Sequence, residues 1–301
     1  MKKVIIVQGP TASGKTALAI SLAKRLKTEV ISADSRQFYK EMSIGTAKPD
    51  AFELSQVKHH FIDIASVKEE ISAAKFAKMA QPVLENLLSE SDFAVIAGGS
   101  GMFIDALVLG LDDIPVSESV KKQLIEEYNT FGLTPLLAEL EEKDFVYYET
   151  VDRNNAARII RALEAIRVSG KKMSELQSQV KSPKKDFDIL RFSIDWPRDL
   201  LYERINKRVD IMFENGLMEE VHSLAEYRNL NALNTVGYKE IFDFIDEKIS
   251  KQDAVNLIKQ HTRNYAKRQM TWLRRYSELH YLNPLMEQSL EQQAFNFLLQ
   301  K

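Results

Sequence analysis

The sequence predicts an α/β protein in which a parallel sheet is flanked by helices and a helical subdomain is inserted into the chain. Short β-branched runs alternate with helix-forming stretches over residues 2–97, strand signals are absent from 112 to 187, and one strand-like run returns at 189–196. Parallel strands need a helical crossover, because the chain must return to the same end of the sheet. We therefore expect a core of residues 1–112 and 189–301 and a helical insertion of residues 113–188.

The composition limits the class of protein further. The 301 residues carry a formal net charge of −2, are 45% hydrophobic and include no cysteine. The chain is therefore too apolar to be disordered, too polar to be embedded in a membrane, and lacks the thiols of disulfides and Cys-ligated zinc. The apolar run Val4–Val7 is much shorter than the core of a signal peptide. We expect a cytoplasmic protein that acts as a monomer and contacts no membrane.

The elements of the core can be expected in order from buried runs and the breakers that end them. The first strand ends at Gly9 and Pro10, and the next strands end near Asp34 and Gly98. The expected strands are 2–8, 28–33, 61–64, 93–97 and 189–196, and the expected helices of the first part are 14–26 and 73–88. We expect the insertion, and the chain beyond residue 197, to be helical. In the insertion, Ile159, Leu163 and Ile166 recur at helical spacing.

A complete phosphate-binding loop follows the first predicted strand and precedes the first predicted helix, which is the context that this motif requires. The loop consists of Gly9, Pro10, Thr11, Ala12, Ser13, Gly14, Lys15 and Thr16. Its backbone N–H groups can converge on phosphate oxygens, Lys15 supplies a positive charge, and the Thr16 hydroxyl can bind a Mg²⁺ that bridges phosphates. The core is therefore expected to be P-loop NTPase-like. The motif predicts diphosphate binding and does not by itself predict phosphoryl transfer.

Polar residues follow two further strands at the same edge of the sheet. Asp34 can cap a helix, bind Mg²⁺ or accept a proton as a general base, while Arg36 and Gln37 are suited to reading a nucleotide. The cluster Gly98–Gly101 contains Ser100. It is either a packing turn or a place where the backbone closely approaches a ligand.

Two segments are strongly basic. Residues 153–185 hold nine Lys and Arg but two acids, a net charge of +7, and residues 254–277 hold six basic residues and no acid. A basic run is usually only a solvated surface, but two such runs are typical of a protein that grips an RNA stem-loop. We expect Tyr265 and Trp272, in the second run, to pack in the core.

Taken together, these segments resemble one family over essentially the whole chain: the bacterial-type tRNA dimethylallyltransferases, also called tRNA isopentenyltransferases. The resemblance is carried by GPTASGKT at Gly9, DSRQFY at Asp34, GTAKP at Gly45, HHFID at His59, GGSGMF at Gly98, RIIRALE at Arg158, GYKE at Gly237 and TRNYAKRQMTW at Thr262. Their order and spacing make the match specific. The family has Leu-Tyr where this chain has Met102-Phe103 after the glycine-rich turn.

The resemblance implies an activity. In this family a dimethylallyl group passes from dimethylallyl diphosphate to N6 of adenosine 37, beside the tRNA anticodon, with Mg²⁺ as cofactor and release of diphosphate. It implies catalytic roles for Asp34, as general base, and for Ser100 and Lys15. It adds Arg208 to the P-loop residues that bind diphosphate, and it assigns the metal to Thr16. The implied contacts with the tRNA anticodon stem-loop are Asp34, Ser35, Arg36, Gln37, Ser100, Lys121, Ala157, Arg158, Ile159, Ile160 and Arg161.

Two other functions fit part of the sequence. A small-molecule or nucleotide kinase would share the P-loop, the parallel sheet and a helical lid, but would use ATP. An RNA-binding nucleotide switch is disfavoured, because the chain has no Asn-Lys-x-Asp run for reading guanine.

Overall fold

The structure, a computed structural model, describes residues 2–111, 114–178 and 186–299. The chain divides into two compact units. The first unit comprises Met1–Val108 and Lys184–Lys301, and the second comprises Leu109–Pro183. The sequence-based insertion, 113–188, extends further toward the C-terminus than the second unit, because Phe187 and Asp188 already belong to a strand of the sheet.

The first unit is built on a sheet of six strands in the order β3-β2-β4-β1-β5-β6. Every pairing in it is parallel. The strands are β1 (Lys2–Gln8), β2 (Val30–Ser32), β3 (His59–His60), β4 (Phe93–Gly98), β5 (Phe187–Ile194) and β6 (Leu279–Leu282). Strand β1 is central, since Val4 pairs with Ala94 on one side and with Ile189 on the other. The predicted α/β class is confirmed.

Three strand predictions need correction. Strand β3 lies two residues before the predicted run 61–64, because Phe61 and Asp63 adopt left-handed backbone conformations that end a strand. Strand β5 begins and ends two residues earlier than predicted. Strand β6 was missed altogether, since a four-residue edge strand that contains His280 and Tyr281 has no buried run to signal it.

Helices cover both faces of the sheet, as a parallel sheet requires. One face packs its buried residues, among them Ile5, Val7 and Phe192, against α1 (Lys15–Leu26) and α14 (Leu290–Leu299). The other carries α3 (Ala73–Glu90) and α4 (Gly101–Val108). There Phe38 stacks on Phe76, and Phe103 packs against both rings.

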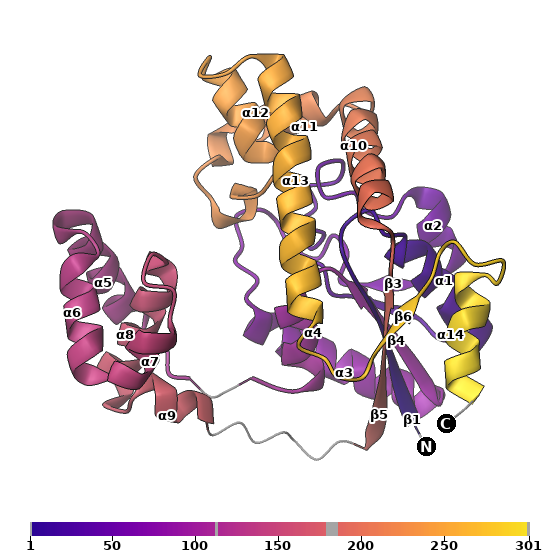
Figure 1. Ribbon diagram of the computed structural model, residues 1–301, viewed down its shortest axis with the longest axis horizontal. Helices are drawn as coiled ribbons and strands as arrows, with labels where there is room; N and C mark the ends of the chain where they lie inside the picture. The colour runs from indigo at the N-terminus through magenta and orange to yellow at the C-terminus, as the bar shows by residue number, and fades with distance from the viewer. Residues whose placement is uncertain (1, 112–113, 179–185, 300–301) are drawn as a thin grey trace. The chain divides into compact units, whose positions relative to one another are not determined.

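Helix α2 (Ala51–Gln56) packs against α1. The remaining helices of this unit gather beyond the carboxyl edge of the sheet, where α13 runs beside α10 and α12 (Figure 1). They are α10 (Arg198–Glu214), α11 (Leu217–Ser223), α12 (Tyr238–Ile245) and α13 (Lys251–Leu273). Short 3₁₀ turns at Ala225–Tyr227 and Asn231–Leu233 connect α11 to α12.

The second unit is helical in its described part. Its helices are α5 (Glu118–Phe131), α6 (Thr134–Lys143), α7 (Phe145–Thr150), α8 (Ala156–Ser169) and α9 (Met173–Ser178). Ile159, Leu163 and Ile166 are buried in its core, as their spacing predicted. Among the described residues of the whole chain, no helix is long and apolar enough to cross a membrane.

Candidate active site

The P-loop joins β1 to α1 and is held in place by side chains from later in the chain. The Trp196 indole N–H donates to the Ser13 carbonyl, and the Arg204 guanidinium donates to the Ala12 carbonyl, each at 2.9 Å. The Lys15 ammonium donates to the carbonyl of Pro10 at 2.8 Å. The pKa of Lys15 is lowered to about 8, mainly because the ammonium is shielded from water and also because Arg208 is near, while Asp34 acts in the opposite direction. The loop is therefore strongly electropositive and ready to receive an anion.

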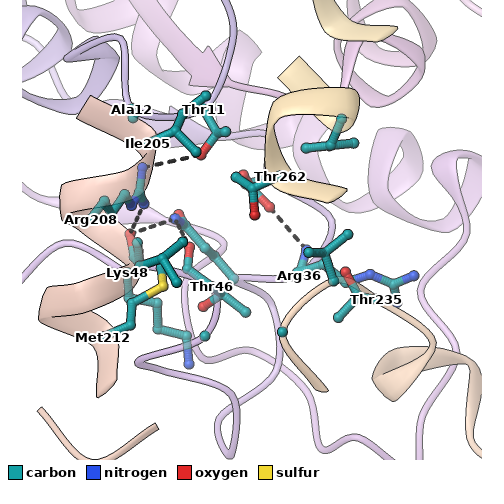
Figure 2. Close-up of a pocket in the computed structure, with 18 of the residues that line it drawn as sticks. Thr11, Ala12, Arg36, Thr46, Lys48, Ile205, Arg208, Met212, Thr235 and Thr262 are labelled. Carbon is teal, nitrogen blue, oxygen red and sulfur yellow. Dashed lines mark hydrogen bonds between the residues drawn. The ribbon is translucent and has the colours of Figure 1, made fainter. Parts of the chain in front are cut away.

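Arg208 reaches this loop from α10 (Figure 2). Its Nη1 donates to the Thr11 hydroxyl at 3.2 Å, and its Nη2 donates to the Ala47 carbonyl at 3.5 Å. Burial lowers the pKa of Arg208, and the field of Asp34 opposes that shift. The structure thus places Arg208, which is distant in the sequence and was predicted to bind diphosphate, next to the P-loop.

Asp34 follows β2 and begins a turn at the same edge of the sheet. Its Oδ1 accepts the backbone N–H of Arg36 at 3.1 Å, which is an Asx turn and not a helix cap. Among the described residues, none donates a hydrogen bond to Oδ2 in the structure. The turn is tied to the glycine-rich segment, since Ser100 Oγ accepts the Ser35 N–H at 3.1 Å and donates to the Ser35 hydroxyl at 3.2 Å.

Two other residues of this turn are engaged within the protein. Gln37 is nearly buried, and its amide nitrogen donates to the carbonyls of Thr46 and Ala47, each at 3.1 Å. Arg36 donates to the carbonyl of Asn231 at 2.9 Å. Gln37 therefore supports the wall of the site, and Arg36 lines the same cavity.

One cavity of about 1100 Å³ connects these groups. Of the predicted substrate-binding residues, those that line it are Thr11, Ala12, Gly14, Lys15, Thr16, Asp34, Ser35, Arg36, Gln37 and Arg208. Gly9, Pro10, Ser13 and Ser100 support the loops behind its surface, and the buried Ser13 hydroxyl has no hydrogen-bond partner among the described residues. The described residues contain no cluster of three or more His, Asp or Glu that could hold a metal alone.

A carboxylate that holds one wall of this cavity could not be recognised from the sequence pattern around it. Glu220 of α11 accepts the backbone N–H groups of Ser43, Ile44 and Gly45 at 2.7–3.0 Å and the Tyr238 hydroxyl at 2.6 Å. Burial, with Glu220 beside it, raises the pKa of Tyr238. The segment GTAKP is thus held from α11 and α12.

One face of α13 rests on the glycine-rich turn. A side chain at Gly99 would collide with Gln269, and one at Gly101 would collide with Trp272. The turn is therefore a packing turn, and close approach of a ligand is not needed to explain its glycines. The expectation that Tyr265 is core was wrong, because it is 36% exposed and lines the cavity.

In the second unit, the predicted tRNA contacts separate into two groups. Lys121, Ala157 and Arg158 are exposed. The side chains of Ile159 and Ile160 are buried in the helical core by the periodicity that makes α8 amphipathic. Their contact with tRNA stays a prediction.

Arg161 is occupied within the second unit. Its guanidinium donates to the carbonyls of Ile114 and Pro115 at 2.9 and 2.7 Å and to Glu164 at 3.0 Å. Arg161 therefore ties the start of the second unit to α8.

Both basic runs are partly neutralised by acids that lie elsewhere in the sequence. Arg167 pairs with Glu127 and Glu139 of neighbouring helices, and on α13 Lys259 pairs with Asp210 of α10. The basic residues 181, 184 and 185 lie outside the described residues. The charge count along the chain thus overstates the positive surface.

Comparison with known proteins agrees with this geometry. The family model described as IPP transferase matches residues 37–276. A tRNA dimethylallyltransferase of Christiangramia forsetii is 45% identical over 277 residues, 92% of this chain and 91% of that protein, and one of Cytophaga hutchinsonii is 41% identical over 284 residues, 94% and 93% of the two chains.

Solved structures give the same result. The full-length tRNA isopentenylpyrophosphate transferase of Bacillus halodurans aligns with a TM-score of 0.73 at 33% identity, covering 100% of this chain and 96% of that one. A eukaryotic dimethylallyltransferase acting on tRNA aligns with a TM-score of 0.79 at 26% identity, covering 94% and 74%. From the matched family model and from relatives that share two fifths of its residues along nearly its full length, the chain belongs to the IPP transferase family.

Proposed function

We propose that this chain is a tRNA dimethylallyltransferase, which transfers the dimethylallyl group from dimethylallyl diphosphate to N6 of adenosine 37 in tRNA. The observation that carries the proposal is that Lys15, Arg208 and Asp34 line one cavity. Two cations for a diphosphate and one carboxylate for a proton are the groups that this transfer needs. The family and its named relatives support the same reaction and do not favour the kinase alternative.

The chemistry follows from the roles of these groups. The adenine N6 attacks the first carbon of the dimethylallyl group, the bond from that carbon to the diphosphate oxygen breaks, and the proton released from N6 passes to Asp34. A positioned base contributes about 10²–10⁴-fold to such a step. The leaving diphosphate gains negative charge, which the P-loop N–H groups, Lys15 and Arg208 stabilise.

Mg²⁺ is part of the proposal. The Thr16 hydroxyl lines the cavity next to Lys15, and Mg²⁺ is commonly held by one or two protein oxygens together with substrate phosphates and water. A site that offers Mg²⁺ few protein oxygens is therefore consistent with this kind of coordination. When bound there, Mg²⁺ would neutralise charge on the diphosphate.

The tRNA anticodon stem-loop is the proposed macromolecular partner. Arg36 lines the cavity from its turn, and Lys121 and Arg158 are exposed on α5 and α8 of the second unit. We also propose that the enzyme works as a monomer in the cytoplasm. Light scattering of the purified chain, alone and with tRNA, tests the monomer.

The direct test is product analysis. The purified chain is incubated with Mg²⁺, dimethylallyl diphosphate and an unmodified tRNA with A36 and A37, and the digested nucleosides are examined by mass spectrometry. We expect prenylated adenosine, and none when A37 is replaced by guanosine. A parallel reaction with ATP and candidate small-molecule acceptors tests the kinase. Phosphorylated product without any prenylated adenosine would overturn the proposal.

A further inference from the structure

We propose that Gln269 of α13 is a positioning residue that holds the diphosphate loop and the Asp34 turn at a fixed separation. The inference rests on the proposed function and names a residue outside the set of substrate ligands. Gln269 Oε1 accepts the backbone N–H of Thr11 at 2.9 Å, and its Nε2 donates to the carbonyl of Gly99 at 3.0 Å. One amide side chain therefore joins the P-loop to the glycine-rich turn.

The orientation of this amide is fixed by its partners. A backbone N–H can only donate and a backbone carbonyl can only accept, so the oxygen must face Thr11 and the nitrogen must face Gly99. Gln269 is 8% exposed. A Cβ at position 99 would lie 2.4 Å from Nε2. The absence of a side chain at Gly99 is what allows Gln269 to reach across.

Neighbouring residues on the same face of α13 hold the turn with it. Tyr265, four residues earlier, lies near Ser100, and Trp272, three residues later, covers Gly101. Residues three and four apart share a face of a helix. The face formed by Tyr265, Gln269 and Trp272 is thus shaped to seat this turn.

Further hydrogen bonds connect the glycine-rich turn to the turn that carries the proposed general base. Ser100 is hydrogen-bonded to Ser35, the residue after Asp34. A path of direct contacts therefore runs from Thr11 through Gln269, Gly99 and Ser100 to the turn that carries Asp34. The Thr11 N–H is satisfied by Gln269, whose nearly buried side chain lies at the wall of the cavity.

This arrangement predicts an effect on turnover. The P-loop fixes the diphosphate and the Asp34 turn fixes the base, so loss of the bridge lets the two drift apart while each still binds its own ligand. A misplacement of about 1 Å can cost about 10²-fold in rate. We expect kcat to fall about 10- to 100-fold in a bridge variant, with both KM values within about threefold of wild type.

The sharpest variant is Gln269→Glu, which keeps the shape of the side chain and its acceptor toward Thr11. The carboxylate places an oxygen against the Gly99 carbonyl in place of a donor. Two acceptors then face each other, so we expect kcat to fall at least as far as in a variant that lacks both hydrogen bonds.

Two further variants complete the experiment. Gln269→Met removes both hydrogen bonds at similar volume, and we expect a low kcat with both KM values near those of wild type. Gln260→Glu adds the same charge to an exposed position of α13, and we expect no change. Thermal melting and inorganic diphosphate binding are measured for every variant to confirm a folded P-loop.

The outcomes are separable. A Gln269→Glu protein with wild-type kcat would overturn the proposed positioning role of Gln269. So would a variant whose activity is reduced only through a raised KM. Failure of the proposed function is distinguishable, because it would be seen in the wild-type chain as absence of prenylated tRNA.

Discussion

Arg208 lies close enough to Lys15 for its positive charge to help lower the lysine pKa to about 8. Dimethylallyl diphosphate binds best to protonated Lys15, so its affinity is expected to fall as pH rises through 8. The limiting slope is about tenfold per pH unit, since one proton is taken up on binding. Calorimetry with this substrate alone, from pH 7 to 9.5, measures the effect.

Arg208→Met serves as the comparison for this titration. Without the positive charge of Arg208, the pKa of Lys15 rises, so the affinity for dimethylallyl diphosphate begins to fall at a higher pH. The contact between Arg208 and the diphosphate is also lost, which weakens binding at every pH. An affinity that stays constant from pH 7 to 9.5 in the wild-type chain would contradict the role of Lys15.

Asp34→Asn is expected to separate chemistry from binding. The amide can still accept the Arg36 N–H in the Asx turn, but it is a very poor proton acceptor. We expect prenyl transfer to fall by about 10²–10⁴-fold with tRNA affinity changed less than about threefold. Single-turnover rates and filter binding measure the two quantities. A large loss of affinity with normal turnover would make Asp34 a contact for tRNA and not the base.

Arg158 and Arg161, three residues apart, are expected to behave differently. Arg158→Gln removes an exposed charge and should lower tRNA affinity, with the slope of log affinity against log salt reduced by about 1. Arg161→Gln removes the guanidinium that donates to the carbonyls of Ile114 and Pro115 and pairs with the buried Glu164 carboxylate. This change should lower the free energy of unfolding of the second unit by about 1–3 kcal/mol. Salt titrations of binding and hydrogen exchange of α8 measure these effects. Identical salt slopes for the wild type and Arg158→Gln would remove Arg158 from the RNA surface.

Gly101→Ala is expected to destabilise the protein although it lies in a helix. Alanine is normally favoured over glycine in helices by about 1 kcal/mol, but here a Cβ would lie 2.1 Å from the Trp272 indole nitrogen. We expect a net loss of about 1–3 kcal/mol in the free energy of unfolding. In a Trp272→Leu background the same change should cost less, and a double-mutant cycle by urea unfolding measures the coupling. Additive effects would show that the two residues do not meet.

The parts of the site that could be predicted from the sequence are those formed by residues that are consecutive in the chain. The P-loop is a complete motif between a strand and a helix, and Asp34 follows a buried run, so local pattern and sheet topology were enough to place both. Arg208 was assigned through family resemblance, and its contact with Thr11 agrees with that assignment.

The missed parts depend on contacts between distant segments. Gln269 and Thr11 are 258 residues apart in the sequence, and no local sequence pattern around either residue predicts their hydrogen bond. The partial neutralisation of residues 153–185 was missed for the same reason, since Glu127 and Glu139 reach Arg167 from other helices. Strand β6 escaped because a short, partly exposed edge strand carries little hydrophobic pattern.

The central place of β1 has a consequence for synthesis of the protein. Its neighbour β5 begins at Phe187, and Gln269 lies further still along the chain. A growing chain therefore presents the P-loop strand with one edge unpaired until more than half of the protein has left the ribosome, and such an edge invites aggregation. The first motif to be translated is thus among the last to reach its functional geometry, and fragments that end before α13 would carry an intact P-loop sequence without a working site.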